Sequence, residues 1–313
     1  MLSTAALRSP SVQWAGPLLL FAGVLCISFA ALFVQVSGLP PTAAGLHRMG
    51  TASVLLILWA MGSGARPAAV APPRGVARLA VTLLILAGVA FAFDMAMWNR
   101  SILAIGPGMA TLIANLQIFL VPVIAGVLGA GWPRRRFWMA ALAALFGLAL
   151  LAVPLGTLDS GLDPTGLMLG LGAAALYSVY IAFLGESSRR WALGPTLTLL
   201  VVCSAGALTL GTIQVAELVL DPAASVLART PSAWLGVAGM SLVCQLGGWG
   251  LLLRGIQRVG AAAAGVALVG QSVLATVWDV VLLGRQLSPQ ELIGGAIVLV
   301  SIAAAFSAAR TQR

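Results

Sequence analysis

The amino-acid sequence predicts an all-α membrane protein, with ten transmembrane helices arranged as two inverted five-helix repeats. Three observations carry this prediction: charge is scarce, ten long segments are apolar, and the two halves of the chain repeat weakly. Of the 313 residues, 60% are hydrophobic and only 8% are charged, whereas a soluble domain carries about 25% charged residues. A chain with so little charge cannot cover a surface that faces water, so we expect lipid around it.

Ten segments are apolar and long enough to cross a bilayer, which takes roughly 20 residues. The first follows Arg8 and is too long for the apolar part of a signal peptide, so we expect it to remain as a span. Proline often stands between the segments, where it suits the first turn of the next helix. A short polar corner, Asn99-Arg100-Ser101, is expected between the third and fourth spans. The predicted spans are residues 14–37, 41–63, 76–98, 102–130, 136–155, 165–186, 195–219, 231–256, 261–284 and 289–309.

Arginine supplies all 17 basic residues and sets the predicted orientation. If the N-terminus and every second loop lie in the cytoplasm, Arg100, Arg229 and Arg285 fall on the other side and Arg48 falls within the second span. Basic residues favour the cytoplasmic side of a membrane protein, so we expect both termini there. The arginines on the cytoplasmic side are then Arg8, Arg66, Arg74, Arg78, Arg134, Arg135, Arg136, Arg189, Arg190, Arg254, Arg258, Arg310 and Arg313.

The second half of the chain repeats the first at a few positions, and we place the repeats at residues 1–156 and 157–313. Five helices per half is an odd number, so the second repeat must enter the membrane from the opposite face. Inverted repeats of this kind build two related conformations around a central site. In the first helices a shift of 150 residues pairs Gly16, Ser28 and Phe33 with Gly166, Ser178 and Phe183. Further on, a shift of 154 pairs Arg100, Ile102, Gly106, Ala110 and Gln117 with Arg254, Ile256, Gly260, Ala264 and Gln271.

Asp94 and Trp98 lie four residues apart on the third span and share a helix face with Phe91. A polar side chain inside a bilayer costs free energy unless it is paired or wetted, so such residues are the first candidates for a transport path. One interpretation is a cavity wall with one titratable group and an aromatic surface. The other is that Asp94 pairs with Arg48 or Arg100 near the outer interface, and that Trp98 is an interfacial belt residue.

His47 and Arg48 lie inside the second span, and orientation does not explain Arg48. A fixed positive charge there could hold a substrate carboxylate. The interpretation that we favour is that Arg48 snorkels to the headgroups or pairs with an acid. At the end of the sixth span, we expect Glu186 to pair with Arg189 or Arg190.

Amide and indole groups recur on the fourth, eighth and ninth spans. Asn115 and Gln117 point to different faces of the fourth span, and we assign Asn115 to the cavity and the other face to helix packing. Ser241, Gln245 and Trp249 form a stripe at intervals of four residues. Together with the third span, these helices are expected to line one path, and hydrogen bonding between helices is the alternative.

Gln271 and Trp278 lie seven residues apart, on one face of the ninth span. Tyr177 and Tyr180 on the sixth span lie three residues apart and are further candidates for the cavity, with an interface or core role as the alternative. The candidate substrate-binding residues are therefore Trp98, Asn115, Gln245, Trp249, Gln271, Trp278, Asp94, Tyr177, His47 and Arg48.

Two motifs in the first half, Pro40-Pro41 ahead of Arg48 and the turn Asp94-x-x-x-Trp98-x-x-Ser101-Ile102, resemble the EamA type of the drug/metabolite transporter superfamily. The second half resembles the ending of the same family from Gln257-Arg258-Val259-Gly260 to Leu283-Gly284, and then in Leu287-Ser288-Pro289-Gln290 and Ile293-Gly294. The resemblance covers nearly the whole chain. It implies an exporter of small metabolites or drugs in a bacterial-type inner membrane, with amino acids as cargo in some members and aromatic ones in the YddG-like branch.

We therefore expect a secondary transporter that exports aromatic or other hydrophobic amino acids, or related compounds, by alternating access. No phosphate loop, metal-ligand cluster or nucleophile motif occurs in the sequence, so no catalytic residue, metal or cofactor is expected. The expected partners are a small-molecule substrate and the lipid bilayer, without nucleic acid, and we expect a monomer. The alternatives are a channel and a multipass membrane enzyme, for which Asp94 with Asp279 is the one candidate pair.

Overall fold

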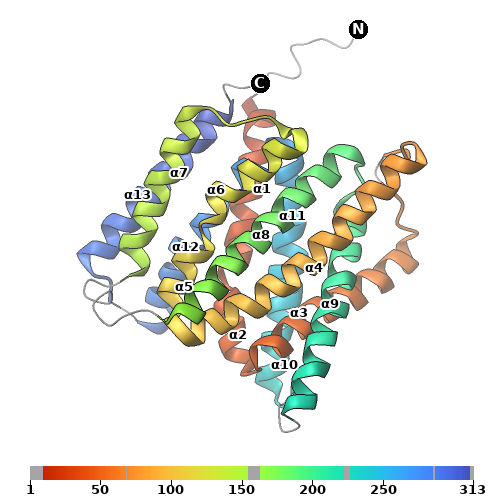
Figure 1. Ribbon diagram of the computed structural model, residues 1–313, viewed down its shortest axis with the longest axis horizontal. Coiled ribbons are helices and arrows are strands. Elements are labelled where there is room, and N and C mark those ends of the chain that lie inside the picture. The colour runs from red at the N-terminus through yellow and green to blue at the C-terminus, as the bar shows by residue number, and fades with distance from the viewer. Residues whose placement is uncertain (1–9, 68, 154–162, 222–225, 285, 311–313) are drawn as a thin grey trace.

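The computed structural model describes residues 10–67, 69–153, 163–221, 226–284 and 286–310, and every regular element in these residues is a helix (Figure 1). Nine of the described helices are long and apolar enough to cross a membrane, and a shorter apolar helix covers Pro289–Ala305. The predicted all-α membrane fold is therefore confirmed. Arg8, Arg285 and Arg313, and the predicted boundary between residues 156 and 157, lie outside the described residues.

Each half of the chain forms five spans, some of them broken into shorter helices. The first half contains α1 (Pro10–Ser28), α2 (Ala30–Ser37), α3 (Pro41–Ser63), α4 (Arg74–Ile105), α5 (Pro107–Ala114), α6 (Gln117–Ala125), the π-helix η2 (Gly126–Ala130) and α7 (Arg135–Ala152). The second half contains α8 (Pro164–Arg190), α9 (Pro195–Leu220), α10 (Pro231–Ala238), the π-helix η4 (Gly239–Gly248), α11 (Trp249–Val259), α12 (Ala261–Leu283) and α13 (Pro289–Arg310). Proline begins many of these helices, because its fixed φ suits the first turn. Its missing N–H costs nothing there, since an N–H in the first turn has no acceptor within the helix.

The predicted corner at Asn99-Arg100-Ser101 is wrong, because α4 continues through it as one helix of 32 residues. None of the three residues blocks helical backbone, and Arg100 donates a hydrogen bond from Nη1 to the carbonyl oxygen of Ala96, at 2.7 Å. The break comes at Gly106, whose φ of +81° favours glycine. Pro107 follows, and it has no N–H with which to continue the helix.

Helix packing repeats between the two halves in the way that an inverted repeat requires. The most extensive helix pairs include α4 with α8, α7 with α13, α3 with α9, and α1 with α11. When each helix is replaced by its equivalent in the other half, the pair of α4 and α8 becomes the pair of α11 and α1. The pairs α3 with α9 and α7 with α13 are unchanged by this replacement. α7 and α13 lie side by side along one edge of the bundle (Figure 1).

Close contacts at two glycines show the same symmetry at the level of single atoms. A Cβ added to Gly16 of α1 would lie 2.6 Å from Cγ1 of Val259, and one added to Gly166 of α8 would lie 2.6 Å from Cγ2 of Ile105. Gly16 and Gly166 are 150 residues apart, and Ile105 and Val259 are 154 apart. These are the two shifts that the sequence predicts, and each half therefore crosses the other at an equivalent place.

α1 begins and α13 ends at the same end of the bundle, as an even number of crossings requires (Figure 1). Three spans are irregular between their ends: α1 gives way to α2 at Phe29, α5 gives way to α6 at Asn115 and Leu116, and η4 interrupts the eighth span. In membrane transporters, broken helices near the bilayer midplane commonly border the substrate site.

Candidate functional site

A buried group of polar and aromatic side chains lies where helices of both halves meet, and we call it the central cluster. α3 and α4 bring its charged groups, α8 and α11 bring most of its aromatic rings, and α9 and η4 complete it. Its members are Arg48, Phe91, Asp94, Tyr177, Tyr180, Cys203, Gln245 and Trp249.

Arg48 is the charged residue at the centre of this cluster. Its side chain is 8% exposed, and its Nε donates a hydrogen bond to Oε1 of Gln245 at 2.9 Å. Its two terminal amino groups have no hydrogen-bond partner among the described residues, and no described acid forms an ion pair with it. The expectation that Arg48 snorkels or pairs with an acid is therefore wrong: the side chain turns inward, where an amide of the other half fixes one edge of its guanidinium group.

Aromatic rings pack on one another beside the guanidinium group, and the Phe91 ring lies closest to it. The Phe91 and Tyr180 rings stack with centroids 4.3 Å apart, and the Trp249 ring meets Tyr180 edge-on at 4.6 Å. Tyr177 lies 6.2 Å from Phe91, and Cζ of Arg48 lies 5.7 Å from the Phe91 centroid. A cation over the face of an aromatic ring is attracted by the ring quadrupole, so the rings partly compensate for the loss of water around Arg48.

Asp94 is as buried as Arg48, with 8% of its surface exposed. It has neither a hydrogen bond nor an ion pair with any described residue, although it interacts electrostatically with Arg48 and Tyr177. The Tyr180 hydroxyl and the Trp249 indole N–H are also buried without a partner in the described part of the chain. Buried polar groups are nearly always hydrogen-bonded, so this set of unpartnered groups is consistent with a site that a polar ligand completes.

The predicted stripe on the eighth span falls on the π-helix η4 and the first residue of α11. Ser241, Gln245 and Trp249 are all buried, and the Ser241 hydroxyl donates to the Arg48 carbonyl oxygen at 3.3 Å. Gln245 also donates from Nε2 to Sγ of Cys203, at 3.5 Å. The stripe therefore lies against α3 and α9 and holds Arg48 at both its backbone and its side chain.

The amides of the fourth and ninth spans make their contacts elsewhere. Asn115 is buried at the α5–α6 break, and its Nδ2 donates to the Thr111 carbonyl oxygen of its own span at 2.8 Å. Gln117 joins two spans, because its Nε2 donates to the carbonyl oxygen of Gly265 on α12 at 3.0 Å. Oε1 of Gln271 on α12 is buried without a partner among the described residues. Among the described residues, these amides therefore make no hydrogen bond with a member of the central cluster.

The remaining candidates lie apart from the central cluster. Trp278 donates from Nε1 to the Ser28 hydroxyl at 2.8 Å and stacks on Phe29 at 4.4 Å, beside the α1–α2 break. Nε2 of His47 lies 2.7 Å from the carbonyl oxygen of Val226, in the connection before α10. Trp98 is half-buried on α4, and the side chain of Asp279 lies outside what the structure describes.

Ion pairs occupy other parts of the bundle. Arg100 pairs with Glu217 of α9, not with Asp94, and Thr42 donates its hydroxyl to the same carboxylate at 2.8 Å. Glu186, which is buried, pairs with Arg190 at 2.7 Å and with Arg189 at 3.1 Å. The prediction for Glu186 is therefore confirmed with both arginines.

The list of candidate residues chosen from sequence omits three members of the central cluster. Phe91 lies three residues before Asp94, and that spacing already places it on the Asp94 face of the third span. Tyr180 follows Tyr177 by three residues on α8, so the same spacing pairs the two tyrosines as cavity candidates. Cys203 has no signal in the sequence, because a cysteine in an apolar run is usually a packing residue.

Comparison with known proteins gives a consistent result. Residues 164–307 match the EamA-like transporter family. The chain is 25% identical over 283 residues to the uncharacterized transporter YwfM of Bacillus subtilis (strain 168), which covers 87% of this chain and 86% of the relative. A protein of known crystal structure superposes with a TM-score of 0.73 over 94% of this chain and 98% of its own length, at 19% identity, so the two share a fold.

Proposed function

We propose that this chain, an EamA-type member of the drug/metabolite transporter superfamily, is a secondary transporter that exports amino acids with aromatic or other hydrophobic side chains. The family and the named relative are transporters, and the cargo and its direction are our proposal. The observation that carries it is the central cluster, where a buried arginine with free amino groups lies near a buried, unpaired carboxylate and a group of aromatic rings.

The carboxylate of the substrate would bind Arg48. The guanidinium group presents planar, parallel N–H donors that match both oxygens of a carboxylate. Because Gln245 occupies only Nε, the two terminal amino groups are left to receive the substrate. A buried charge without a partner is costly in a membrane protein, and a bound carboxylate would remove that cost.

The ammonium group of the substrate would lie at Asp94. Asp94 has no partner among the described residues, and it lies on the same helix as Phe91, one turn away. A zwitterion bound between Arg48 and Asp94 would neutralise both charges at once. This pairing favours free amino acids over simple carboxylic acids or amines, which satisfy one of the two charges.

The side chain of the substrate would pack among the rings of Phe91, Tyr177, Tyr180 and Trp249. Aromatic pairs in offset or edge-on arrangements contribute about 0.5–1.5 kcal/mol beyond the burial of their area. An aromatic or branched apolar substrate side chain gains this contact, and a charged one does not. The unpartnered Tyr180 hydroxyl and Trp249 N–H would give the substrate two further polar contacts.

Movement of the two halves would open the site by alternating access. Three rings and the amide of the cluster are almost fully buried, and Tyr177 is partly buried, so a substrate needs the helices around them to separate. The crossings of α4 with α8 and of α1 with α11 are related by exchange of the halves. An opening at one of them therefore has a counterpart of the same kind at the other, and the site would face each side of the membrane in turn.

The proposed location is a bacterial-type inner membrane with both termini in the cytoplasm. The support is the positive-inside rule. Arg74 and Arg78 begin α4, Arg134 to Arg136 lie at the start of α7, and Arg189 and Arg190 end α8. Tags on the two termini that report from opposite sides of the membrane would contradict this orientation.

The test is export of amino acids from cells that accumulate them. A strain that is sensitive to hydrophobic dipeptides should tolerate phenylalanine- and tryptophan-containing dipeptides when the chain is overproduced. Arg48→Gln should abolish the tolerance at equal protein levels, and Arg100→Gln should keep it, because Arg100 lies outside the central cluster. Tolerance that Arg48→Gln leaves intact, or no tolerance to any amino acid, would contradict the proposal.

A further inference from the structure

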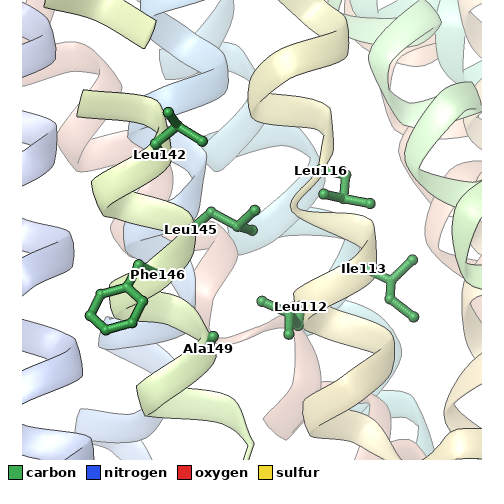
Figure 2. Close-up of a pocket in the computed structure, with 7 residues that line it drawn as sticks. All are labelled: Leu112, Ile113, Leu116, Leu142, Leu145, Phe146 and Ala149. Carbon is green, nitrogen blue, oxygen red and sulfur yellow. The ribbon is translucent and has the colours of Figure 1, made fainter. Parts of the chain in front are cut away.

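An open groove of about 410 Å³ lies between the α5–α6 segment and α7, and no member of the central cluster lines it. Its lining is entirely apolar. Leu112, Ile113 and Leu116 form one wall, and Leu142, Leu145 and Phe146 form most of the other. Figure 2 shows the side chains of the two walls on either side of the open space.

The break in the fourth span accounts for the groove. α5 ends at Ala114 and α6 begins at Gln117, so the wall that faces α7 changes direction beside Leu116. The equivalent ninth span, α12, is one continuous helix that packs on α13.

The groove opens onto the face that lipid covers. Leu142 and Phe146 of α7 are each 60% exposed, as is Met139 on the same side of the helix. An empty apolar space loses the dispersion contacts that its lining would otherwise make. In a bilayer the molecules that can supply those contacts are lipid acyl chains.

The same face of α7 carries positive charge at the membrane surface. Arg135, Leu142 and Ala149 are seven residues apart and share a helix stripe. Arg134, Arg135 and Arg136 are all exposed at the start of α7. At 1.5 Å per residue, the groove residues of α7 lie between about 10 Å (Leu142) and about 21 Å (Ala149) along the axis from Arg135. One leaflet, with its headgroup region, contributes about half of the roughly 40–45 Å bilayer, so a lipid with its phosphate at Arg135 has a chain that passes Leu142 and ends near Ala149.

We infer that this surface binds an anionic phospholipid, with its headgroup at Arg134 to Arg136 and one acyl chain in the groove beside the α5–α6 break. Arginine recognises phosphate through paired N–H donors, and basic residues next to a span select anionic lipids. The exposed Trp132, which precedes the arginines, suits the headgroup level, where indole rings are enriched. The inference is independent of the transported substrate.

Native mass spectrometry of the purified, delipidated protein tests it. The protein is titrated with phosphatidylglycerol or with phosphatidylcholine that has the same acyl chains. We expect one phosphatidylglycerol to bind in preference to phosphatidylcholine. Arg135→Gln should lower that preference roughly fivefold, as expected for one basic residue near an anionic surface. Ala149→Phe, which fills the groove, should abolish the bound lipid.

The matched control is Ala303→Phe. Ala303 is an exposed alanine on α13, the helix that packs against α7. This variant should bind lipid as the unmodified chain does. Three results would overturn the inference. The first is equal binding of the two headgroups, and the second is equal lipid binding by Ala149→Phe and Ala303→Phe. The third is a dimer that only Ala149→Phe dissociates, which would assign the groove to a second copy of the chain.

Discussion

The two halves of the molecule place their spans in equivalent positions but bring different chemistry to the centre. Gly106 and Gly260 end the third and eighth spans at equivalent places, with φ of +81° and +90°. At the central cluster, however, the first half supplies Arg48 and Asp94, and the second half supplies Gln245 and most of the rings. Position 248, which is equivalent to Asp94, is a glycine.

This difference suggests how a symmetric scaffold can hold an asymmetric substrate. Both charges of a zwitterion are matched by one half, and its side chain is matched mainly by the other. A substrate that contacts both sets of groups would stabilise the state in which the halves meet.

The largest effect is expected from Gln245→Glu, which moves an acid to the second half. The new carboxylate would form an ion pair with Arg48 and compete with the substrate. We expect transport to fall at least roughly 30-fold, since a buried charge pair of this kind is worth about 2 kcal/mol or more. Counterflow of labelled phenylalanine in proteoliposomes measures it.

Gln245→Ala is the control for that variant. It removes one hydrogen bond from Arg48 and leaves the charge free, so transport should fall by a few-fold only, in line with about 1 kcal/mol for one bond. If both variants are equally impaired, the charge of Arg48 is not what the substrate needs.

Asp94→Asn should lower transport roughly tenfold, because it keeps the shape of the side chain and removes the charge that the ammonium group would meet. Glu217→Gln serves as the matched acid outside the central cluster and should keep the apparent affinity unchanged. An Asp94→Asn variant with unchanged flux would remove the carboxylate from the proposed site and would also exclude proton coupling through it.

Gly16→Ala and Gly166→Ala test the equivalence of the two halves. Each added Cβ would lie 2.6 Å from a neighbouring side chain, and overpacking of this kind costs about 1–3 kcal/mol. Both variants should lose thermal stability in detergent by a similar amount. Gly50→Ala is the control, since its Cβ would meet no atom within 4 Å, and a large loss in only one of the two test variants would mean that the crossings are not equivalent.

The smallest effect is expected at the half-exposed pair of Arg100 and Glu217. Exposed ion pairs contribute about 0–1 kcal/mol, so Glu217→Gln should lower the melting temperature slightly. Glu186→Gln should lower it more, because that carboxylate is buried and pairs with two arginines. The reverse order of the two melting temperatures would contradict this assignment.

The sequence was sufficient for the membrane fold and for the repeat, because apolar length, proline starts and glycine breaks act locally. It failed at Asn99-Arg100-Ser101, where polar residues were read as a corner. Their partners, Ala96 within the helix, Gly166 on α8 and Glu217 on α9, let them remain helical. Such distant partners cannot be found from one sequence.

The site was predictable only in part. Polar residues within apolar spans pointed to Arg48, Asp94, Gln245 and Trp249, which the structure brings together. The same rule also selected Trp278, whose N–H is satisfied by Ser28 across the α1–α2 break. Hydropathy marks a buried polar group, but only the packing of the helices decides whether a neighbouring side chain already satisfies it.

Substrate binding to the purified protein shows whether Arg48 holds the carboxylate of the substrate. Calorimetry would compare L-phenylalanine with its carboxamide, which lacks the carboxylate, in the unmodified chain and in Arg48→Gln. The account predicts that the unmodified chain prefers the free acid by at least roughly tenfold, as a charged hydrogen-bonded pair implies, and that Arg48→Gln binds the two alike. A preference for the free acid that survives in Arg48→Gln would show that the buried arginine does not hold the substrate.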